Sequence, residues 1–208
     1  LLGKNLVDKR KIILIKNSIK YLLKKYSKKF SNKDIDEQLI YLRKKDKIKF
    51  GYLFDSLQTL AINYEILSNS KILKKISNLL NADISSITLT DVALRLDPPH
   101  DERNSLGWHQ DSSYFPFDRE PQVAAWLATS EATLENGCLV VLPGSHKESL
   151  HEHLPDDREG SNYGYTEIKD HDFSLEEPIL LNRGDLLLFH SFLMHKSYDN
   201  KSDSRRTA

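Results

Sequence analysis

The 208-residue sequence has a single cysteine, no net charge and no long apolar run, and each absence excludes a class of protein. Cys138 cannot form an internal disulfide, so we expect a protein of a reducing compartment. No apolar run reaches the length of a membrane span, and the run at residues 12–15 is too short for a secretory signal. These absences predict a cytoplasmic protein without integral membrane association.

Basic and acidic residues number 30 each, but the two signs are unevenly distributed. Residues 1–50 hold 16 basic and 5 acidic residues, a net charge of +11, so residues 51–208 carry −11. We interpret the basic end as a solvated helical face that lies against an acidic body. The alternative is an anionic partner such as a phosphate, coenzyme A or a membrane surface, and the overall balance gives no reason to expect nucleic acid.

The first part of the chain has the apolar periodicity of amphipathic helices. This pattern covers four stretches, residues 9–29, 31–42, 50–67 and 70–80. The second stretch begins at the segment Ser-Asn-Lys-Asp of residues 31–34, and Ser70 is the expected cap of the last. Residues 1–84 are therefore predicted to form a helical region that packs on the outside of the core.

After residue 84 the pattern changes to short runs typical of strands. These runs are residues 87–96, 122–129, 138–142, 179–181, 186–190 and 192–196. Helices followed by short strands, without regular alternation, predict an α+β fold with a mainly β core. We expect a double-stranded β-helix (jelly roll, cupin-like) over residues 85–208, joined to the helices in one structural domain. Residues 147–178 lack periodicity and are expected to form a lid-like insertion.

The segment WHQD at residues 108–111 carries the strongest chemical signal. In an extended strand His109 and Asp111 point to the same side, which places an imidazole beside a carboxylate. This pair is two thirds of the 2-His-1-carboxylate triad that binds Fe(II). An H-x-D pair occurs often by chance, so the prediction depends on a second histidine farther along the chain.

Several histidines could supply that ligand. Those after Asp111 are His146, His151, His153, His171, His190 and His195. We interpret the histidines of the insertion, including His151 and His153, as solvated surface groups. His190 and His195 both lie in strand-like sequence, and the residue pattern alone leaves both open.

From about residue 88 to residue 208 the chain resembles the phytanoyl-CoA dioxygenase family of Fe(II)/2-oxoglutarate oxygenases. The matching segments are LDPP (96–99), WHQD (108–111), YFPF (114–117), AW (125–126), NGCLVVLPGSHK (136–147), GD (184–185), HKS (195–197) and RTA (206–208). Their order and spacing make the signature specific, whereas the first 80 or so residues show little of it.

The resemblance implies a ligand set and a co-substrate site. It makes His195 the second histidine ligand beside His109 and Asp111, with Lys196 where the family usually has glycine. His190 and His146 then become structural residues. A basic residue 10 or 11 positions beyond the distal histidine grips the far carboxylate of 2-oxoglutarate in this family, and a guanidinium suits that carboxylate. That implies Arg206, with Arg205 as the alternative, and further co-substrate contacts from Ser197, Trp126 and Gln110.

The implied activity is hydroxylation of a small organic substrate with consumption of O2 and 2-oxoglutarate and release of succinate and CO2. Asp111 argues against the related halogenases, which lack this carboxylate. On charge alone, the basic segment is compatible with a CoA-linked or phosphorylated substrate. The resemblance implies a monomer or a homodimer.

Two alternatives stay open. One is a metal-binding or scaffold protein without activity, expected if the last barrel strand ends at Ala208, and the other is a cupin-like Zn(II) or Mn(II) protein.

Overall fold

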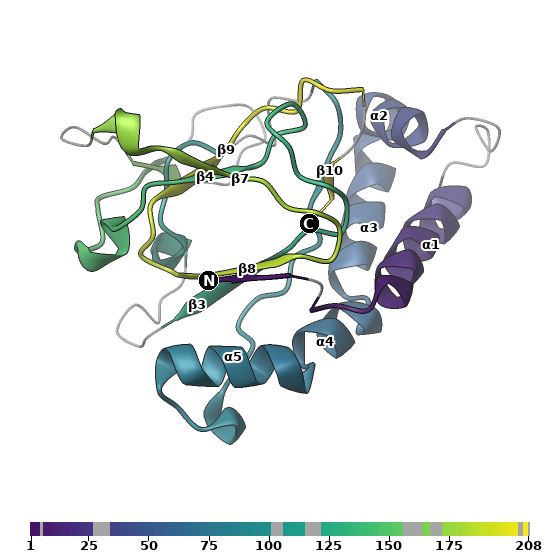
Figure 1. The fold of residues 1–208 in the computed structure, drawn as a ribbon. Coiled ribbons are helices and arrows are strands. Elements are labelled where there is room, and N and C mark those ends of the chain that lie inside the picture. The colour runs from purple at the N-terminus through teal and green to yellow at the C-terminus, as the bar shows by residue number, and fades with distance from the viewer. Residues whose placement is uncertain are drawn as a thin grey trace.

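The computed structural model describes residues 1–4, 6–26, 34–100, 106–114, 122–155, 164–166, 172–203 and 206–207 (Figure 1). After the short strand β1 (Leu2–Gly3) come five helices that lie outside the strands. They are α1 (Lys9–Tyr26), α2 (Ile35–Lys45), α3 (Lys47–Gln58), α4 (Ala61–Leu67) and α5 (Ser70–Leu80). In Figure 1, α4 and α5 lie below the strands, and α1, α2 and α3 lie to their right.

The helices form where apolar periodicity and capping predict them, with two corrections. Asp34 caps α2 by accepting a 2.8 Å hydrogen bond from the N–H of Asp36, as the predicted start requires. The cap of α5 is Asn69, whose side chain accepts from the N–H of Lys71, so the prediction of Ser70 was wrong by one residue. Residues 27–33, where the first predicted helix ends and the second begins, lie outside the described residues.

The predicted helix over residues 50–67 is two helices, because the chain turns at residues 59–60 between α3 and α4. The side-chain amide of Asn63 donates a 2.9 Å hydrogen bond to the carbonyl of Leu57. This bond supplies a partner for a carbonyl that the end of α3 leaves without a helical one. A local polar contact thus stabilises a break that apolar periodicity does not reveal.

The strands form small antiparallel sheets. Their bounds are β2 (Leu96–Asp97), β3 (Val123–Leu127), β4 (Leu139–Val141), β5 (Leu154–Pro155), β6 (Gly164–Tyr165), β7 (Glu177–Ile179), β8 (Leu186–His190), β9 (His195–Ser197) and β10 (Arg206–Thr207). The two three-stranded sheets have the orders β1-β8-β3 and β7-β4-β9, and β2 pairs with β10 and β5 with β6. The predicted strands at 122–129, 138–142 and 186–190 are confirmed with small changes at their ends.

The predicted strand over residues 87–96 was mostly wrong, since only Leu96–Asp97 pairs with another strand. The backbone just before β2 bonds to a helix side chain instead. Gln58 accepts from the N–H of Leu94 at 2.6 Å and donates to its carbonyl at 3.1 Å. The side-chain amide of Gln58 thereby takes the place of a neighbouring strand as the hydrogen-bond partner of this backbone. Alternating hydrophobicity alone cannot show whether an extended segment pairs with a strand or with a side chain.

Two apolar clusters lie on opposite faces of the sheet β1-β8-β3. One contains buried side chains of all five helices together with Leu94, just before β2, and the strand residues Leu96, Leu127, Leu186 and Leu188. The other lies between this sheet and β7-β4-β9 and includes Leu139, Leu187 and Phe189. The sheet therefore separates a helix-facing core from an inner core, and the functional residues lie on the inner side. None of the helices in the described residues is long and apolar enough to cross a membrane.

Candidate metal centre

His109 and His195 are brought together by an isolated bridge between two segments that lie far apart in the sequence. Each residue donates its backbone N–H to the carbonyl of the other, at 2.9 and 3.1 Å. Their rings lie 4.1 Å apart between centroids, and both side chains are almost fully buried. The convergence of His195 on the H-x-D segment is the arrangement that the family resemblance implies.

Asp111 completes the group, although its backbone is not extended as predicted. It begins a short 3-10 helix, η4 (Asp111–Tyr114), which the hydroxyls of Ser112 and Ser113 anchor to Ser191 and to the carbonyl of Gln110. The carboxylate still reaches the two imidazoles. Its Oδ1 lies 3.7 Å from Nε2 of His109 and 3.5 Å from Nε2 of His195.

One ligand atom from each of these three residues lies within 4.8 Å of the others, which is compact enough for one metal ion. Both imidazoles present Nε2 to the carboxylate, and the hydrogen bonds of Nδ1 show that Nε2 is free of a proton. Nδ1 of His109 lies 2.8 Å from the carbonyl of Gly107, and Nδ1 of His195 lies 2.9 Å from the carbonyl of Leu193. A carbonyl only accepts hydrogen bonds, so Nδ1 carries the proton and the Nε2 lone pair of a neutral ring faces the centre. Two such nitrogens and a carboxylate oxygen fit the donor set of a ferrous ion.

The electrostatics favour the same protonation states. Burial is the main cause that lowers the pKa of His109 to about 3, and interactions with His195 and Arg95 act in the same direction, whereas the interaction with Asp111 opposes them. Burial alone would raise the pKa of Asp111, but its interactions with His195, His109 and Arg95 outweigh this and lower it. A neutral His109 and an ionised Asp111 are the forms that bind a metal.

Gln110, between the two ligands, is fully buried and joins three segments. Its side chain donates to the carbonyls of Phe192 at 2.9 Å and Ser149 at 3.3 Å, and accepts from the N–H of His151 at 2.8 Å. These bonds tie the start of the predicted insertion to both metal-binding segments. The predicted contact of Gln110 with 2-oxoglutarate stays a prediction.

His153 does not lie on the solvated surface as expected. Its Nε2 accepts a 3.0 Å hydrogen bond from the backbone N–H of Gln110, and Nδ1 lies 2.8 Å from the carbonyl of His151. The N–H of Thr166 donates to the carbonyl of Trp108 at 2.8 Å. Described parts of residues 147–178 therefore pack against the metal-binding segment, whereas residues 156–163 and 167–171, with His171, lie outside the described residues.

Of the two remaining histidines, His190 has a hydrogen bond of the structural kind expected of it, and the expected role of His146 in its loop stays a prediction. Nδ1 of His190 accepts a 3.0 Å bond from the N–H of Phe192, and the His146 ring lies 6.2 Å from that of His190. In the PGSH loop (residues 143–146), the side chain that connects the loop to the segment before His195 is that of Ser145, which the sequence analysis did not single out. Its buried hydroxyl donates to the carbonyl of Leu142 at 2.8 Å and accepts from the N–H of Met194 at 2.9 Å, one residue before His195.

Of the predicted co-substrate residues, Ser197 and Trp126, like Gln110, have side chains that the structure describes. Ser197 is buried, and its Oγ accepts from the N–H of Leu106 at 3.1 Å. Trp126 packs against the inner apolar cluster from β3. The backbone of Arg206 pairs with Asp97 in the β2–β10 ladder, while its side chain and all of Arg205 lie outside the described residues. Their roles stay predictions.

Lys196, which replaces the family's glycine, forms a polar and aromatic cluster. Its Nζ lies 3.0 Å from Oε1 of Glu176 and 4.4 Å from the centre of the Trp108 ring. Trp108 directly precedes His109, so Lys196 connects β9 to the segment that carries the first proposed metal ligand. The contact of a cation with an aromatic face is favourable.

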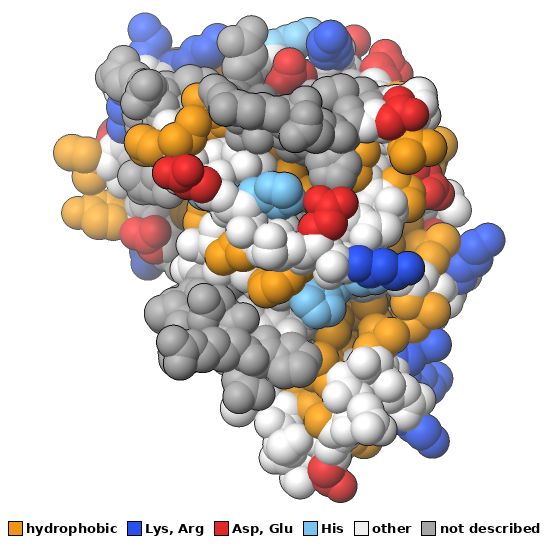
Figure 2. All heavy atoms as spheres, turned by 90° about the vertical axis from the view of Figure 1, so that its left-hand side faces the viewer, with side chains coloured by type: hydrophobic (Ala, Val, Ile, Leu, Met, Phe, Trp, Pro, Cys, Tyr) orange, Lys and Arg blue, Asp and Glu red, His pale blue; other side chains and the backbone are white. Residues whose placement is uncertain are grey.

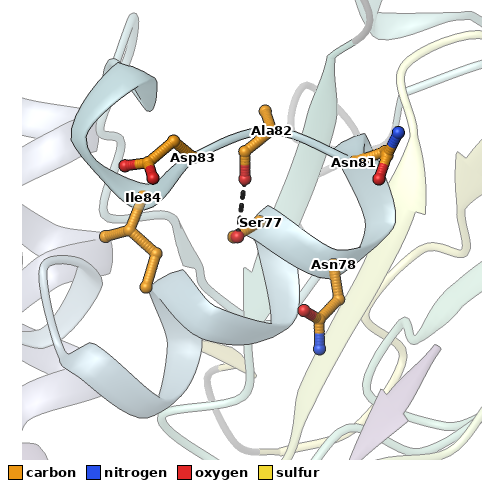
Figure 3. A pocket seen from close by; sticks show the side chains of 6 residues that line it. All are labelled: Ser77, Asn78, Asn81, Ala82, Asp83 and Ile84. Atoms are coloured by element: carbon orange, nitrogen blue, oxygen red, sulfur yellow. Dashed lines mark hydrogen bonds between the residues drawn. The ribbon is translucent and has the colours of Figure 1, made fainter.

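Two hollows in the described part of the surface are lined by residues other than the triad. One of about 320 Å³ is lined by Leu134, Tyr198, Asp199 and Lys201. A broader one of about 760 Å³ lies where α5 meets the next turn, and Figure 3 shows its lining residues with the hydrogen bond from Ser77 to the carbonyl of Ala82. On the face drawn in Figure 2, histidine side chains appear among acidic and apolar ones, and basic side chains lie mostly at the edges.

The family model and the curated relatives that match this chain agree on one family. The model of the family described as phytanoyl-CoA dioxygenase (PhyH) matches residues 27–208. The peroxisomal phytanoyl-CoA dioxygenase of Bos taurus is 41% identical over 103 residues, which is 48% of this chain and 31% of that protein. The chain thus spans about a third of the length of this relative.

Solved structures with low sequence identity have a similar fold. The non-heme monooxygenase ThoJ matches with a TM-score of 0.70 and 18% identity, over 99% of this chain and 70% of that one. The epimerase SnoN, solved with Fe3+, alpha-ketoglutarate and nogalamycin RO, matches with a TM-score of 0.54 and 18% identity over 74% of this chain and 58% of that one. At these identities the likeness shows the fold alone.

Proposed function

Because the chain belongs to the phytanoyl-CoA dioxygenase family, we propose that it is an Fe(II)- and 2-oxoglutarate-dependent oxygenase that hydroxylates a small organic substrate. The products from the co-substrate are succinate and CO2. The observation that carries the proposal is the convergence of His109, Asp111 and His195 with unprotonated nitrogens facing one carboxylate oxygen. The sheets and their inner core support closure into a jelly roll around this centre.

In this proposal the three side chains hold the ferrous ion, which together with 2-oxoglutarate and O2 supplies the oxidising chemistry. Arg206 holds the far carboxylate of 2-oxoglutarate, with Arg205 as the alternative. Ser197, Trp126 and Gln110 shape the surrounding space. SnoN, a structural neighbour that binds iron and alpha-ketoglutarate, supports the cofactor assignment.

Aromatic rings pack beside both proposed histidine ligands. The ring of Phe189 lies 4.8 Å from that of His195, and the ring of Tyr114 lies 5.8 Å from that of His109. These rings cover parts of the two imidazoles, which are 3% and 4% exposed, whereas the Asp111 side chain stays 25% exposed. The relatives' name makes an acyl-CoA ester the substrate class to test first, in agreement with the basic N-terminal segment.

The test needs no knowledge of the substrate. Purified protein is mixed anaerobically with Fe(II) and then with 2-oxoglutarate, and the visible absorbance that a chelated ferrous complex produces is recorded. We expect the band with the natural sequence, its loss in His195→Ala, and its retention in His190→Ala. The second variant is a matched control, because His190 is a nearby histidine whose Nδ1 accepts from a backbone N–H.

Two results would contradict the proposal. A band that persists in His195→Ala but disappears in His190→Ala would move the ligand to residue 190. Binding of Zn(II) or Mn(II) without any effect of 2-oxoglutarate on the Fe(II) spectrum would favour a non-redox metal protein.

A further inference from the structure

Arg95 is a cationic side chain on the inner side of the strand that leads into β2. Its neighbours Leu94 and Leu96 are both buried in the helix-facing cluster. In extended chain, alternate residues point to opposite sides, so Arg95 and Asp97 face away from the helices and toward the inner side. Nη2 of Arg95 lies 3.3 Å from Oδ1 of Asp97, and the two side chains are only 22% and 5% exposed.

The inner side of this strand is the side on which the metal centre lies. On β8, Leu186 and Leu188 share the helix-facing cluster with Leu94 and Leu96, whereas Phe189 belongs to the inner cluster, and its ring lies 4.8 Å from that of His195. Arg95, which alternates with Leu94 and Leu96, therefore faces the inner space in which the triad lies.

Asp97 connects this guanidinium to the strand that carries the predicted clamp. It is the register partner of Arg206 in the β2–β10 ladder. The side chain of Asn200 donates to the backbone carbonyl of Asp97 at 3.0 Å, which holds this end of β2 in place. Arg95 thus lies two residues before Asp97, the buried residue whose backbone is opposite that of Arg206.

Charge balance explains why a second guanidinium belongs here. Asp97 and Asp111 are two anionic groups, and Arg95 and Arg206 are two cationic ones, so the four cancel. A ferrous ion and the 2-oxoglutarate dianion also cancel. Without Arg95 the loaded centre would hold one uncompensated negative charge, which is costly in a buried site. A guanidinium has five N–H donors and can serve two carboxylates at once.

We propose that Arg95 donates hydrogen bonds to a carboxylate of 2-oxoglutarate, as a second guanidinium of the co-substrate site. The inference rests on the proposed function and adds to it a binding residue that lies outside the family motif. Asp97 is its positioning residue, since the ion pair between them orients the guanidinium toward the metal centre.

The test measures binding rather than turnover. Calorimetry follows 2-oxoglutarate binding to protein loaded with Mn(II), which replaces Fe(II) and prevents oxidation. We expect Arg95→Gln to weaken 2-oxoglutarate binding about tenfold to hundredfold, the range of a hydrogen bond to a charged group, while Mn(II) binding stays within about threefold. Arg206→Gln is the reference for loss of the predicted clamp. Arg183→Gln is the matched control, because Arg183 is an exposed arginine in the turn before β8 and should bind as the natural sequence does.

A second ligand identifies which carboxylate Arg95 holds. 2-Oxopentanoate keeps the metal-chelating end of 2-oxoglutarate but lacks the far carboxylate. If Arg95 holds the far end, Arg95→Gln reduces the preference for 2-oxoglutarate over 2-oxopentanoate. If it holds the metal-bound end, both ligands weaken equally and the preference is kept.

Unchanged 2-oxoglutarate affinity in Arg95→Gln, with Mn(II) still bound, would overturn the inference and leave Arg95 with a structural role that includes its ion pair with Asp97. Should thermal melting show that this variant is unfolded, Arg95→Lys decides, because it keeps the charge but loses the planar fork. An affinity in Arg95→Lys equal to that of the natural sequence would then overturn the inference. If the natural sequence with Mn(II) binds no 2-oxoglutarate, the proposed function fails as well, and this result separates the two failures.

Discussion

Three histidines near the metal centre use the same local hydrogen bond. In His109, His153 and His195, Nδ1 lies 2.8–2.9 Å from the carbonyl of the residue two positions earlier. Each ring is thereby fixed as the tautomer that leaves Nε2 as an acceptor. In the two proposed ligands Nε2 faces Asp111, whereas in His153 it accepts from the N–H of Gln110. The same local device therefore serves metal binding in one place and segment docking in another.

The low pKa of His109 makes the metal-free protein sensitive to acid. Its ordinary value is 6.5, and burial lowers the pKa to about 3 in the folded state. Between these values the unfolded chain binds a proton that the folded chain does not, so stability from this group is complete above pH 6.5 and is lost as the pH falls toward 3. We expect the metal-free protein to unfold at lower urea concentration at about pH 5 than at about pH 7.5.

Variants identify the residue responsible. His109→Gln should reduce the dependence of the urea midpoint on pH, because the group that titrates is removed. His151→Gln should keep it, since His151 is a partly exposed histidine beside Glu148. An unchanged pH dependence in His109→Gln would show that the acid sensitivity arises elsewhere.

Among the elements, the loop after β4 holds the segment that precedes His195 in place. Ser145 links the carbonyl of Leu142 to the N–H of Met194, and the next residue is the distal histidine. Ser145→Ala leaves both backbone groups without this partner in a buried position. We expect a loss of about 1–3 kcal/mol in the free energy of unfolding, measured by urea denaturation, and weaker Mn(II) binding.

The matched control is Ser86→Ala, which removes an exposed hydroxyl that donates to the carbonyl of Asp83. Its effect should stay within about 0.5 kcal/mol. Equal stability of both variants would mean that the Ser145 hydroxyl contributes nothing to holding His195.

At the scale of the whole molecule, the helices and the outer faces of the strands share the helix-facing apolar cluster. The helix-facing cluster runs from α1, α2, α3 and α5 to the outer faces of β2, β3 and β8 without interruption. Leu57 on α3 is fully buried in it. We expect Leu57→Ala to lower the free energy of unfolding by about 2–5 kcal/mol. Ile13→Ala, at an exposed position on α1, should change it by no more than about 0.5 kcal/mol.

This continuity also predicts a single unfolding transition. Far-ultraviolet circular dichroism reports the helices, and fluorescence reports Trp108 and Trp126, which both lie in the β-rich part. The two signals should change at the same urea concentration, as one cooperative unit requires. Separate midpoints would show that the helical region and the β core unfold independently.

Local physical rules made the elements predictable where one pattern dominates. The spacing of Ile12, Ile15, Ile19 and Leu23 predicts α1, and these side chains are buried. Prediction failed where a polar side chain replaces a backbone partner. Gln58 satisfies the backbone of Leu94 and so removes the need for a neighbouring strand, and Asn63 stabilises a break between α3 and α4. Such contacts depend on which segments meet, and no local pattern records that.

The sequence by itself determined the H-x-D pair, the order of helices and strands, and, through the family motifs, the choice of His195. These depend on residue type, short spacing and motif order, which are one-dimensional properties. Only the tertiary structure decided that Asp111 turns into a 3-10 helix yet still meets both imidazoles, that His153 and Gln110 join the predicted insertion to the centre, and that Arg95 forms an ion pair with Asp97. These outcomes depend on hydrogen bonds and charges between segments tens of residues apart, and only packing of the whole chain brings those groups within range.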